Sequence, residues 1–259
     1  MSLSFEPDWL RLRERADATA RSTELVASLR HRLTAPVVVA DLGCGTGSAA
    51  RWLAPQLPGP QHWVLYDRDA RLLALAEAEL PAPHTCRTHV GDLASLRADD
   101  LDGVGLVTAS ALLDLLDRAT VDGLVEACVG AGCPALFTLS VTGNVQLWPA
   151  HPLDAAVRAA FNDHQRREGA LGPDASATTA AAFRRRGAAV TVRSSPWRLG
   201  ADDRALVEQW LRGWVEAAFE QRPDPAFTDY LARRLDECAA GALRVEVGHE
   251  DLLAVPADA

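Results

Sequence analysis

The sequence lacks the features by which membrane and nucleic-acid-binding proteins are usually identified. No apolar run approaches the roughly 20 residues that a membrane-spanning helix needs. Its 26 basic residues include no lysine, and the longest basic run is the three arginines at 184–186. With a formal net charge of -9, the chain has no basic patch of the kind that nucleic-acid binding requires. We therefore expect a small-molecule partner, with neither a nucleic acid nor a membrane.

Cysteine is scarce and scattered. The five cysteines are odd in number and show no C-x-x-C spacing, which argues against a disulfide framework and against a zinc site. The first 30 residues carry five acids and no apolar stretch, so we expect no signal peptide. The sequence predicts a cytoplasmic protein without a metal, and it leaves open whether the protein is a monomer or a homodimer.

Strand-like and helix-like segments alternate through the first half of the chain. Alternation at these lengths predicts right-handed crossover units on a parallel sheet. The expected strands are 37–41, 62–67, 86–90, 104–109 and 135–140, and the expected helices between them are 48–55, 69–80 and 118–130.

Additional helices are expected before and after this core. The segment 243–247 alternates apolar and polar residues, which indicates an antiparallel or edge strand. We predict a single domain over 1–259, with a helical cover at 1–35, a core at 36–200 and 241–256, and a helical insertion at 201–240. The other expected elements are helices within 8–32, at 153–168, 175–186, 202–220 and 226–240, and a strand at 189–193.

A glycine-rich loop follows the first strand. Glycines let the backbone adopt positive φ and let a ligand approach the main chain closely, so such a loop indicates a nucleotide-like cofactor. Residues 45–50, GTGSAA, fit the dinucleotide pattern G-x-G-x-x-A, and Asp67 follows Gly47 by 20 residues, where an acid would bind the ribose of NAD. The glycines alone leave the cofactor undecided.

Asp41 favours a different cofactor. It lies two residues before Gly43, where an acid is unfavourable beside a pyrophosphate but suits a ligand with an ammonium and a sulfonium. Residues 41–47, DLGCGTG, resemble the first motif of the class I S-adenosylmethionine-dependent methyltransferases. The resemblance implies a Rossmann-like, doubly wound, seven-stranded sheet with an antiparallel last strand, and S-adenosylmethionine as the cofactor.

Further segments resemble later motifs of that family. By resemblance, Asp67 would hydrogen-bond both ribose hydroxyls, Asp92 would accept from the adenine amino group, and Leu93 would pack on the ring. The segment 106–112 resembles the part beside the methionine moiety. The implied cofactor residues are Asp41, Gly43, Cys44, Gly45, Gly47, Asp67, Arg68, Asp92, Leu93 and Thr108.

The acceptor pocket of this family is built from the N-terminal helices, the segment after the fifth strand and any insertion before the last one. Here these regions, together with Trp197 just before the insertion, hold five of the seven tryptophans, which suggests an aromatic lid over the cleft. Trp214 also belongs to a helical apolar stripe, and such stripes are usually core. The candidate substrate-binding residues are Trp9, Trp148, His151, Asn162, Gln165 and Trp214.

Two residues are candidates for acid–base catalysis. His164 shares a predicted helix face with apolar residues, and its side chain titrates near neutrality, although a hydrogen-bonded structural histidine is an equal alternative. Asp114 lies where many small-molecule members of the family have a histidine. The sequence therefore predicts methyl transfer from S-adenosylmethionine to a small molecule. An NAD(P)-dependent oxidoreductase and a non-catalytic S-adenosylmethionine-binding protein remain as alternatives.

Overall fold

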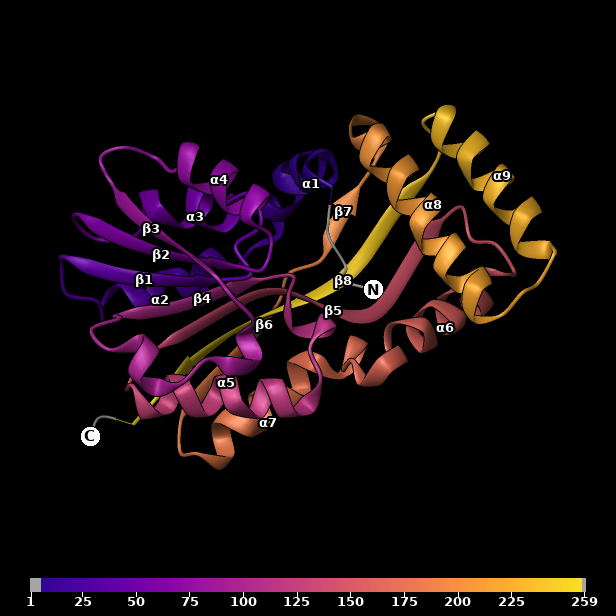
Figure 1. Ribbon diagram of the computed structural model, residues 1–259. Helices are drawn as coiled ribbons and strands as arrows, with labels where there is room; N and C mark the ends of the chain where they lie inside the picture. The colour runs from indigo at the N-terminus through magenta and orange to yellow at the C-terminus, as the bar shows by residue number, and fades with distance from the viewer. Residues whose placement is uncertain (1–5, 258–259) are drawn as a thin grey trace.

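The computed structural model describes residues 6–257, which form a mixed eight-stranded sheet with helices on both faces (Figure 1). The strand order is β3-β2-β1-β4-β5-β8-β6, and the short β7 also pairs with β8. The strands are β1 (Val37–Leu42), β2 (Gln61–Asp67), β3 (Thr85–Val90), β4 (Leu106–Ser110), β5 (Ala135–Trp148), β6 (Ala189–Ser194), β7 (Trp197–Leu199) and β8 (Arg244–Val255).

The pairing confirms the predicted doubly wound fold. Strands β1 to β5 pair in parallel, whereas β8 is antiparallel to both β5 and β6. The eighth strand is β7, which the sequence analysis did not predict. The last strand is not an edge strand, because β6 lies along its outer side.

Both faces of the central strands are buried, as expected for parallel strands between two helical layers. Val39 packs into the cluster beneath α2 and α3, while its neighbour Ala40 packs into the cluster beneath α5 and α7. The helices are α1 (Pro7–Ala20), α2 (Thr23–Arg30), α3 (Ser48–Leu53), α4 (Ala70–Ala78), α5 (Arg118–Gly130), α6 (Asp154–Gln165), α7 (Ala175–Arg185), α8 (Arg204–Gln221) and α9 (Ala226–Ala239).

Strands β5 and β8 are much longer than predicted and extend beyond the parallel part of the sheet. Their pairing continues to Trp148 and Arg244, with register shifts between Phe137 and Ser140 and between Val141 and Val145. Helices α6, α8 and α9 cover this extension and form a second apolar core with it. The prediction that β5 ends at residue 140 was wrong, because the pairing with β8 maintains the strand past these irregularities.

None of the helices within residues 6–257 is long and apolar enough to span a membrane.

Candidate active site

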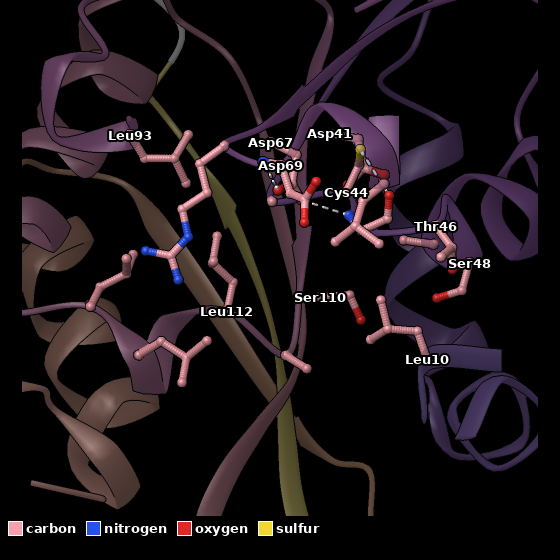
Figure 2. Close-up of a pocket in the computed structure, with 18 of the residues that line it drawn as sticks. Leu10, Asp41, Cys44, Thr46, Ser48, Asp67, Asp69, Leu93, Ser110 and Leu112 are labelled. Atoms are coloured by element: carbon pink, nitrogen blue, oxygen red, sulfur yellow. Dashed lines mark hydrogen bonds between the residues drawn. The ribbon is translucent and has the colours of Figure 1, made fainter. Parts of the chain in front are cut away.

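A cavity of about 600 Å³ lies at the carboxyl ends of β1, β2 and β4 (Figure 2). The strand order reverses at β1, and open α/β sheets bind ligands at this point. Helix α1 covers one side of the cavity with Leu10, Arg13 and Asp17. The carboxyl ends of the strands and the N-terminal helix together enclose the candidate site.

The loop after β1 has a left-handed backbone and close neighbours at two of its glycines. Gly43 has a φ of +63°, and a Cβ on it would lie 2.8 Å from Leu112 Cδ1. Gly47 has a φ of +83°, and a Cβ there would lie 3.2 Å from Ala76 Cα. Glycine therefore lets the loop fold back against these neighbours and leaves room for a ligand beside the main chain.

Asp67 ends β2 with its carboxylate already oriented. The backbone N–H of Gly45 donates to its Oδ2 at 2.9 Å, and the N–H of Asp69 donates to its Oδ1 at 2.9 Å. A carboxylate oxygen accepts more than one hydrogen bond, so both oxygens can still accept from ligand hydroxyls. Asp67 lines the cavity. The two backbone hydrogen bonds fix the orientation of its carboxylate, so that it can accept from a ligand without rearranging.

Asp41 is a buried carboxylate without a hydrogen-bond partner. Its residue is 0% exposed, and neither carboxylate oxygen has a partner among the described residues. Burial raises the pKa of Asp41 to about 7; the positive charge of Arg21 opposes this shift, and the negative charge of Asp67 adds to it. Because native structures rarely leave a buried polar group unpaired, this carboxylate points to a ligand.

The predicted adenine end of the cavity lies beyond β3. Asp92 and Leu93 line it, together with Arg68 from the turn after β2. Asp92 also accepts from the N–H of Ala94 at 3.0 Å and so caps a short 3₁₀ turn. Its role as a helix cap and its position at the cavity are therefore compatible.

Gly47 and Thr108 are the predicted cofactor residues that do not line the cavity. Gly47 directly precedes α3, and because it has no side chain, the start of α3 can lie close to Ala76 of α4. The Thr108 hydroxyl donates to the carbonyl oxygen of Leu136 at 2.9 Å, so its side chain is turned toward β5. Ser110 lies two residues further along β4 and lines the cavity instead. Because side chains alternate along a strand, Thr108 and Ser110 lie on the same face of β4, and Ser110 is the one at the carboxyl end of the strand, where the cavity lies.

The predicted aromatic lid does not lie at the cavity. Trp214 is buried in the second core and stacks on Trp210, with 5.0 Å between ring centroids. Trp9 packs on the same core. Trp148 ends β5, 40% exposed, with the Arg244 guanidinium over its ring. These tryptophans stabilise the extension of β5 and β8, and the core alternative for the apolar stripe fits their positions.

The polar residues predicted to bind the acceptor are also placed elsewhere. The His151 ring packs against Tyr230 with 5.1 Å between centroids. Asn162 donates through Nδ2 to the carbonyl oxygen of Gly143 at 3.0 Å, and Gln165 packs on Gly172. None of these side chains lines the cavity described above.

The two predicted catalytic residues differ in position. His164 Nε2 lies 3.0 Å from Glu220 Oε2, which joins α6 to α8 away from the cavity, so the structural alternative for this histidine fits. Asp114 lies in a 3₁₀ turn between Leu112 and Leu116, which line the cavity. Burial raises the pKa of Asp114 to about 6, and its Oδ1 has no hydrogen-bond partner among the described residues.

The sequence analysis missed the individual residues of α1. Arg13 donates to Asp17 through Nε at 3.0 Å and through Nη2 at 3.2 Å, and Trp197 Nε1 donates to the same carboxylate at 3.0 Å. This buried network fixes the α1 wall of the cavity against β7. The i,i+4 spacing of Arg13 and Asp17 was the available signal, but it does not tell which face of the helix turns inward.

Comparison with known proteins agrees with this geometry. Residues 39–131 match the sequence profile of a family described as methyltransferase domain. This segment is a methyltransferase domain. The match agrees with the predicted methyltransferase family and enzyme class, and the solved structures share the predicted fold. Among the described residues, no group of three histidine, cysteine, aspartate or glutamate side chains could hold a metal ion.

Solved structures share the fold of the methyltransferase at low sequence identity. The cyclopropane synthase MmaA2 from Mycobacterium tuberculosis is 13% identical with a TM-score of 0.52, over 96% of this chain and 94% of that one. The YcgJ protein from Bacillus subtilis is 14% identical with a TM-score of 0.52, over 91% and 98%. The mycolic acid cyclopropane synthase CmaA1, complexed with SAH and CTAB, is 14% identical with a TM-score of 0.50, over 96% and 94%. No curated protein matches the chain significantly.

Proposed function

We propose that the cavity binds S-adenosylmethionine and that the enzyme transfers its methyl group to a small-molecule acceptor. The observation that carries the proposal is the unpartnered, buried carboxylate of Asp41 at the cavity wall. A ligand with an ammonium and a sulfonium would compensate this negative charge, whereas a pyrophosphate would add to it. The NAD-binding alternative is disfavoured for the same reason.

The residues of the cavity would bind and orient the cofactor. Asp67 would accept from the ribose hydroxyls, Asp92 from the adenine amino group, and Leu93 would pack on the adenine ring. The glycine loop would let the ligand lie against the main chain. The cofactor supplies an electrophilic methyl group on its sulfonium, and the protein contributes by positioning the reactants and excluding water.

The acceptor is proposed to be a small molecule, which the negative net charge and the enclosed cavity support. The CmaA1 structure, with SAH and CTAB, shows that this fold can hold small molecules together. Asp114 remains the candidate base for an acceptor that must lose a proton, because the turn that carries it also lines the cavity. A cytoplasmic location and a monomeric or dimeric state remain predictions.

Isothermal titration calorimetry with S-adenosylhomocysteine, NAD and NADP tests the cofactor. We expect binding of S-adenosylhomocysteine and no response to either dinucleotide. Tight binding of NAD without any response to S-adenosylhomocysteine would overturn the proposal. A screen of candidate metabolites with labelled S-adenosylmethionine then tests the acceptor class.

Asp67→Ala should raise the dissociation constant of S-adenosylhomocysteine tenfold or more, which corresponds to about 1.4 kcal/mol. The variant loses the acceptor for the ribose hydroxyls and also releases the N–H of Gly45 from the carboxylate. Calorimetry of the two proteins measures the change. Asp163→Ala, on the exposed side of α6, is the matched control and should bind like the wild type; wild-type affinity in Asp67→Ala would remove Asp67 from the site.

A further inference from the structure

Arg13 is a cation of the cavity wall that no motif contains. It lies on α1, outside the matched residues 39–131, and its side chain is 13% exposed. Leu10 lies three residues earlier on the same face of α1, and Leu115 and Leu116 line the cavity from the turn after β4. None of these residues is assigned to the cofactor, so they form the part of the wall that is left for the acceptor.

The guanidinium of Arg13 has one bonded edge and one open edge. Its Nε and Nη2 donate to the two oxygens of Asp17 at 3.0 and 3.2 Å, which occupies the first edge of the planar fork. Nη1 and the second hydrogen of Nη2 have no hydrogen-bond partner among the described residues. Because Arg13 lines the cavity, its open edge can offer two parallel N–H donors to the two oxygens of a carboxylate.

Asp17 compensates the charge of Arg13 only in part. Its carboxylate also accepts from Trp197 Nε1 at 3.0 Å and lies 3.9 Å from Nη2 of Arg21, the cation that follows α1. Two guanidinium groups and an indole N–H therefore share one carboxylate. A largely buried guanidinium that shares its counter-ion gains from a second anion within hydrogen-bonding distance.

The charge of Arg13 acts at the acceptor end of the cavity. Burial raises the pKa of Asp114, and the positive charge of Arg13 opposes this shift. Burial also lowers the pKa of His249 on β8 to about 4, and the charge of Arg13 adds to that shift. Burial raises the pKa of Asp41 as well, but there the opposing cation is Arg21. Arg13 therefore belongs to the surroundings of the candidate base Asp114 and not to those of Asp41.

We propose that Arg13 recognises a carboxylate on the methyl acceptor, which is an apolar carboxylic acid. The open edge of the guanidinium binds the two carboxylate oxygens, and Leu10, Leu115 and Leu116 contact the apolar body. An amine would place a second cation beside the guanidinium, and the exposed carboxylate of Glu168 in the cavity wall disfavours a dianion such as a phosphate monoester. This inference rests on the proposed function and narrows its acceptor from a small molecule to a monoanionic acid.

Calorimetry on the protein saturated with S-adenosylhomocysteine tests the acceptor class. The probes are hexanoate and 4-phenylbutyrate, each compared with the primary amide and the amine of the same carbon skeleton. In the wild type we expect both carboxylates to bind about tenfold or more tightly than their amides and amines. Arg13→Gln should reduce this preference to about twofold or less and leave the affinity for S-adenosylhomocysteine within about twofold.

Two further variants keep the test decisive. Arg13→Gln leaves the buried Asp17 with fewer partners, whereas Arg13→Gln/Asp17→Asn removes both charges and keeps an acceptor for Trp197, so it serves if the single variant does not fold. The double variant should lose the preference for carboxylates to the same extent. Arg15→Gln, at an exposed position of the same helix, is the matched control and should keep the wild-type preference.

The outcomes separate this inference from the proposed function. The inference is wrong if the wild-type complex binds neither carboxylate, if it binds the amides or amines as tightly, or if the preference for carboxylates survives in Arg13→Gln. A tenfold loss of affinity for S-adenosylhomocysteine in a folded Arg13→Gln protein would place Arg13 at the cofactor and would also overturn the inference. In each of these cases wild-type protein still binds S-adenosylhomocysteine; wild-type protein that does not bind it would instead contradict the proposed function.

Discussion

Asp41→Asn should stabilise the ligand-free protein and at the same time weaken binding of S-adenosylhomocysteine by about 100-fold. The carboxylate is fully buried and accepts no hydrogen bond within the described residues. A neutral amide of the same shape costs less to bury than an unpaired charge. The amide cannot compensate a ligand ammonium, and loss of a buried charged partner costs about 3 kcal/mol of binding free energy.

The stabilisation should depend on pH in a defined direction. Because burial raises the folded-state pKa of Asp41 from 3.8 to about 7, the ionised carboxylate destabilises the fold, fully so above pH 7 and progressively less as the pH falls toward 4. At pH 8 we expect Asp41→Asn to raise the free energy of unfolding by on the order of 2 kcal/mol, which corresponds to a melting temperature higher by about 4–8 °C. At pH 4.5 the two proteins should melt within about 2 °C of each other.

Ligand binding should follow the same titration. An ammonium beside Asp41 lowers the pKa of the carboxyl, so binding releases the proton that Asp41 carries in the free protein below pH 7. The affinity for S-adenosylhomocysteine should therefore fall by up to about tenfold per unit as the pH drops from 7 to 6, and should level off above pH 7. Calorimetry at pH 6 in buffers of different ionisation enthalpy measures the released proton, and Asp41→Asn is the control that should release none.

These two outcomes separate a binding role from a structural one. If Asp41 merely stabilised the loop after β1, its replacement would lower stability and affinity together. A variant that melts lower at pH 8 than the wild type would therefore contradict our interpretation. So would an affinity for S-adenosylhomocysteine that does not change between pH 6 and pH 8.

Most of the residues that the sequence predicts for the cofactor line one cavity, because the signals that point to them are local. The loop 41–47, Asp67 and Asp92 each follow a strand directly, and the carboxyl ends of parallel strands meet at one edge of the sheet. Short-range order along the chain was therefore enough to bring these residues together. Thr108 was misplaced by one strand period, since Ser110 at the end of β4 lines the cavity instead.

The residues that depend on distant contacts were not predictable in this way. Arg21 belongs to a helical segment, and only the packing of α1 and α2 on the sheet places its guanidinium beside Ser48 and Ser110. Strand β5 continues past residue 140 because β8, more than 100 residues later, pairs with it. The tryptophans were assigned to a lid because the sequence shows how many there are in these segments. It does not show the second core, which forms only when β5, β8 and the helices α6, α8 and α9 pack together.

Asp251→Ala should destabilise the protein by about 3 kcal/mol, which corresponds to a melting temperature lower by about 6–12 °C. Asp251 is a buried carboxylate on β8 that joins three separate segments. Its Oδ2 accepts from the N–H of Ser22 at 2.7 Å, and its Oδ1 accepts from the N–H of Leu139 at 2.8 Å and from Ser195 Oγ at 2.6 Å. Alanine would leave the buried N–H of Leu139 and the partly buried N–H of Ser22 without an acceptor.

The contacts of Asp251 reach the site through its neighbours. Ser22 follows Arg21 directly, and Leu139 has a φ of +59° where the register of β5 shifts. Loss of the carboxylate should thus free the turn that carries Arg21, and we expect Asp251→Ala to bind S-adenosylhomocysteine more weakly as well. Glu246→Ala on the same strand removes only an ion pair with the largely exposed Arg198, and should change stability by no more than about 0.5 kcal/mol.

Two buried aspartates should therefore respond in opposite ways when their carboxylates are removed. Burial raises the pKa of both, so desolvation alone does not distinguish them. Asp251 has three donors from the protein, and its loss leaves them unpaired; Asp41 has none, and its loss relieves an uncompensated charge. Thermal melts of Asp41→Asn and Asp251→Ala at pH 8 compare them directly. A fall in melting temperature for both would mean that Asp41 has a protein partner, and its carboxylate would then no longer point to a ligand.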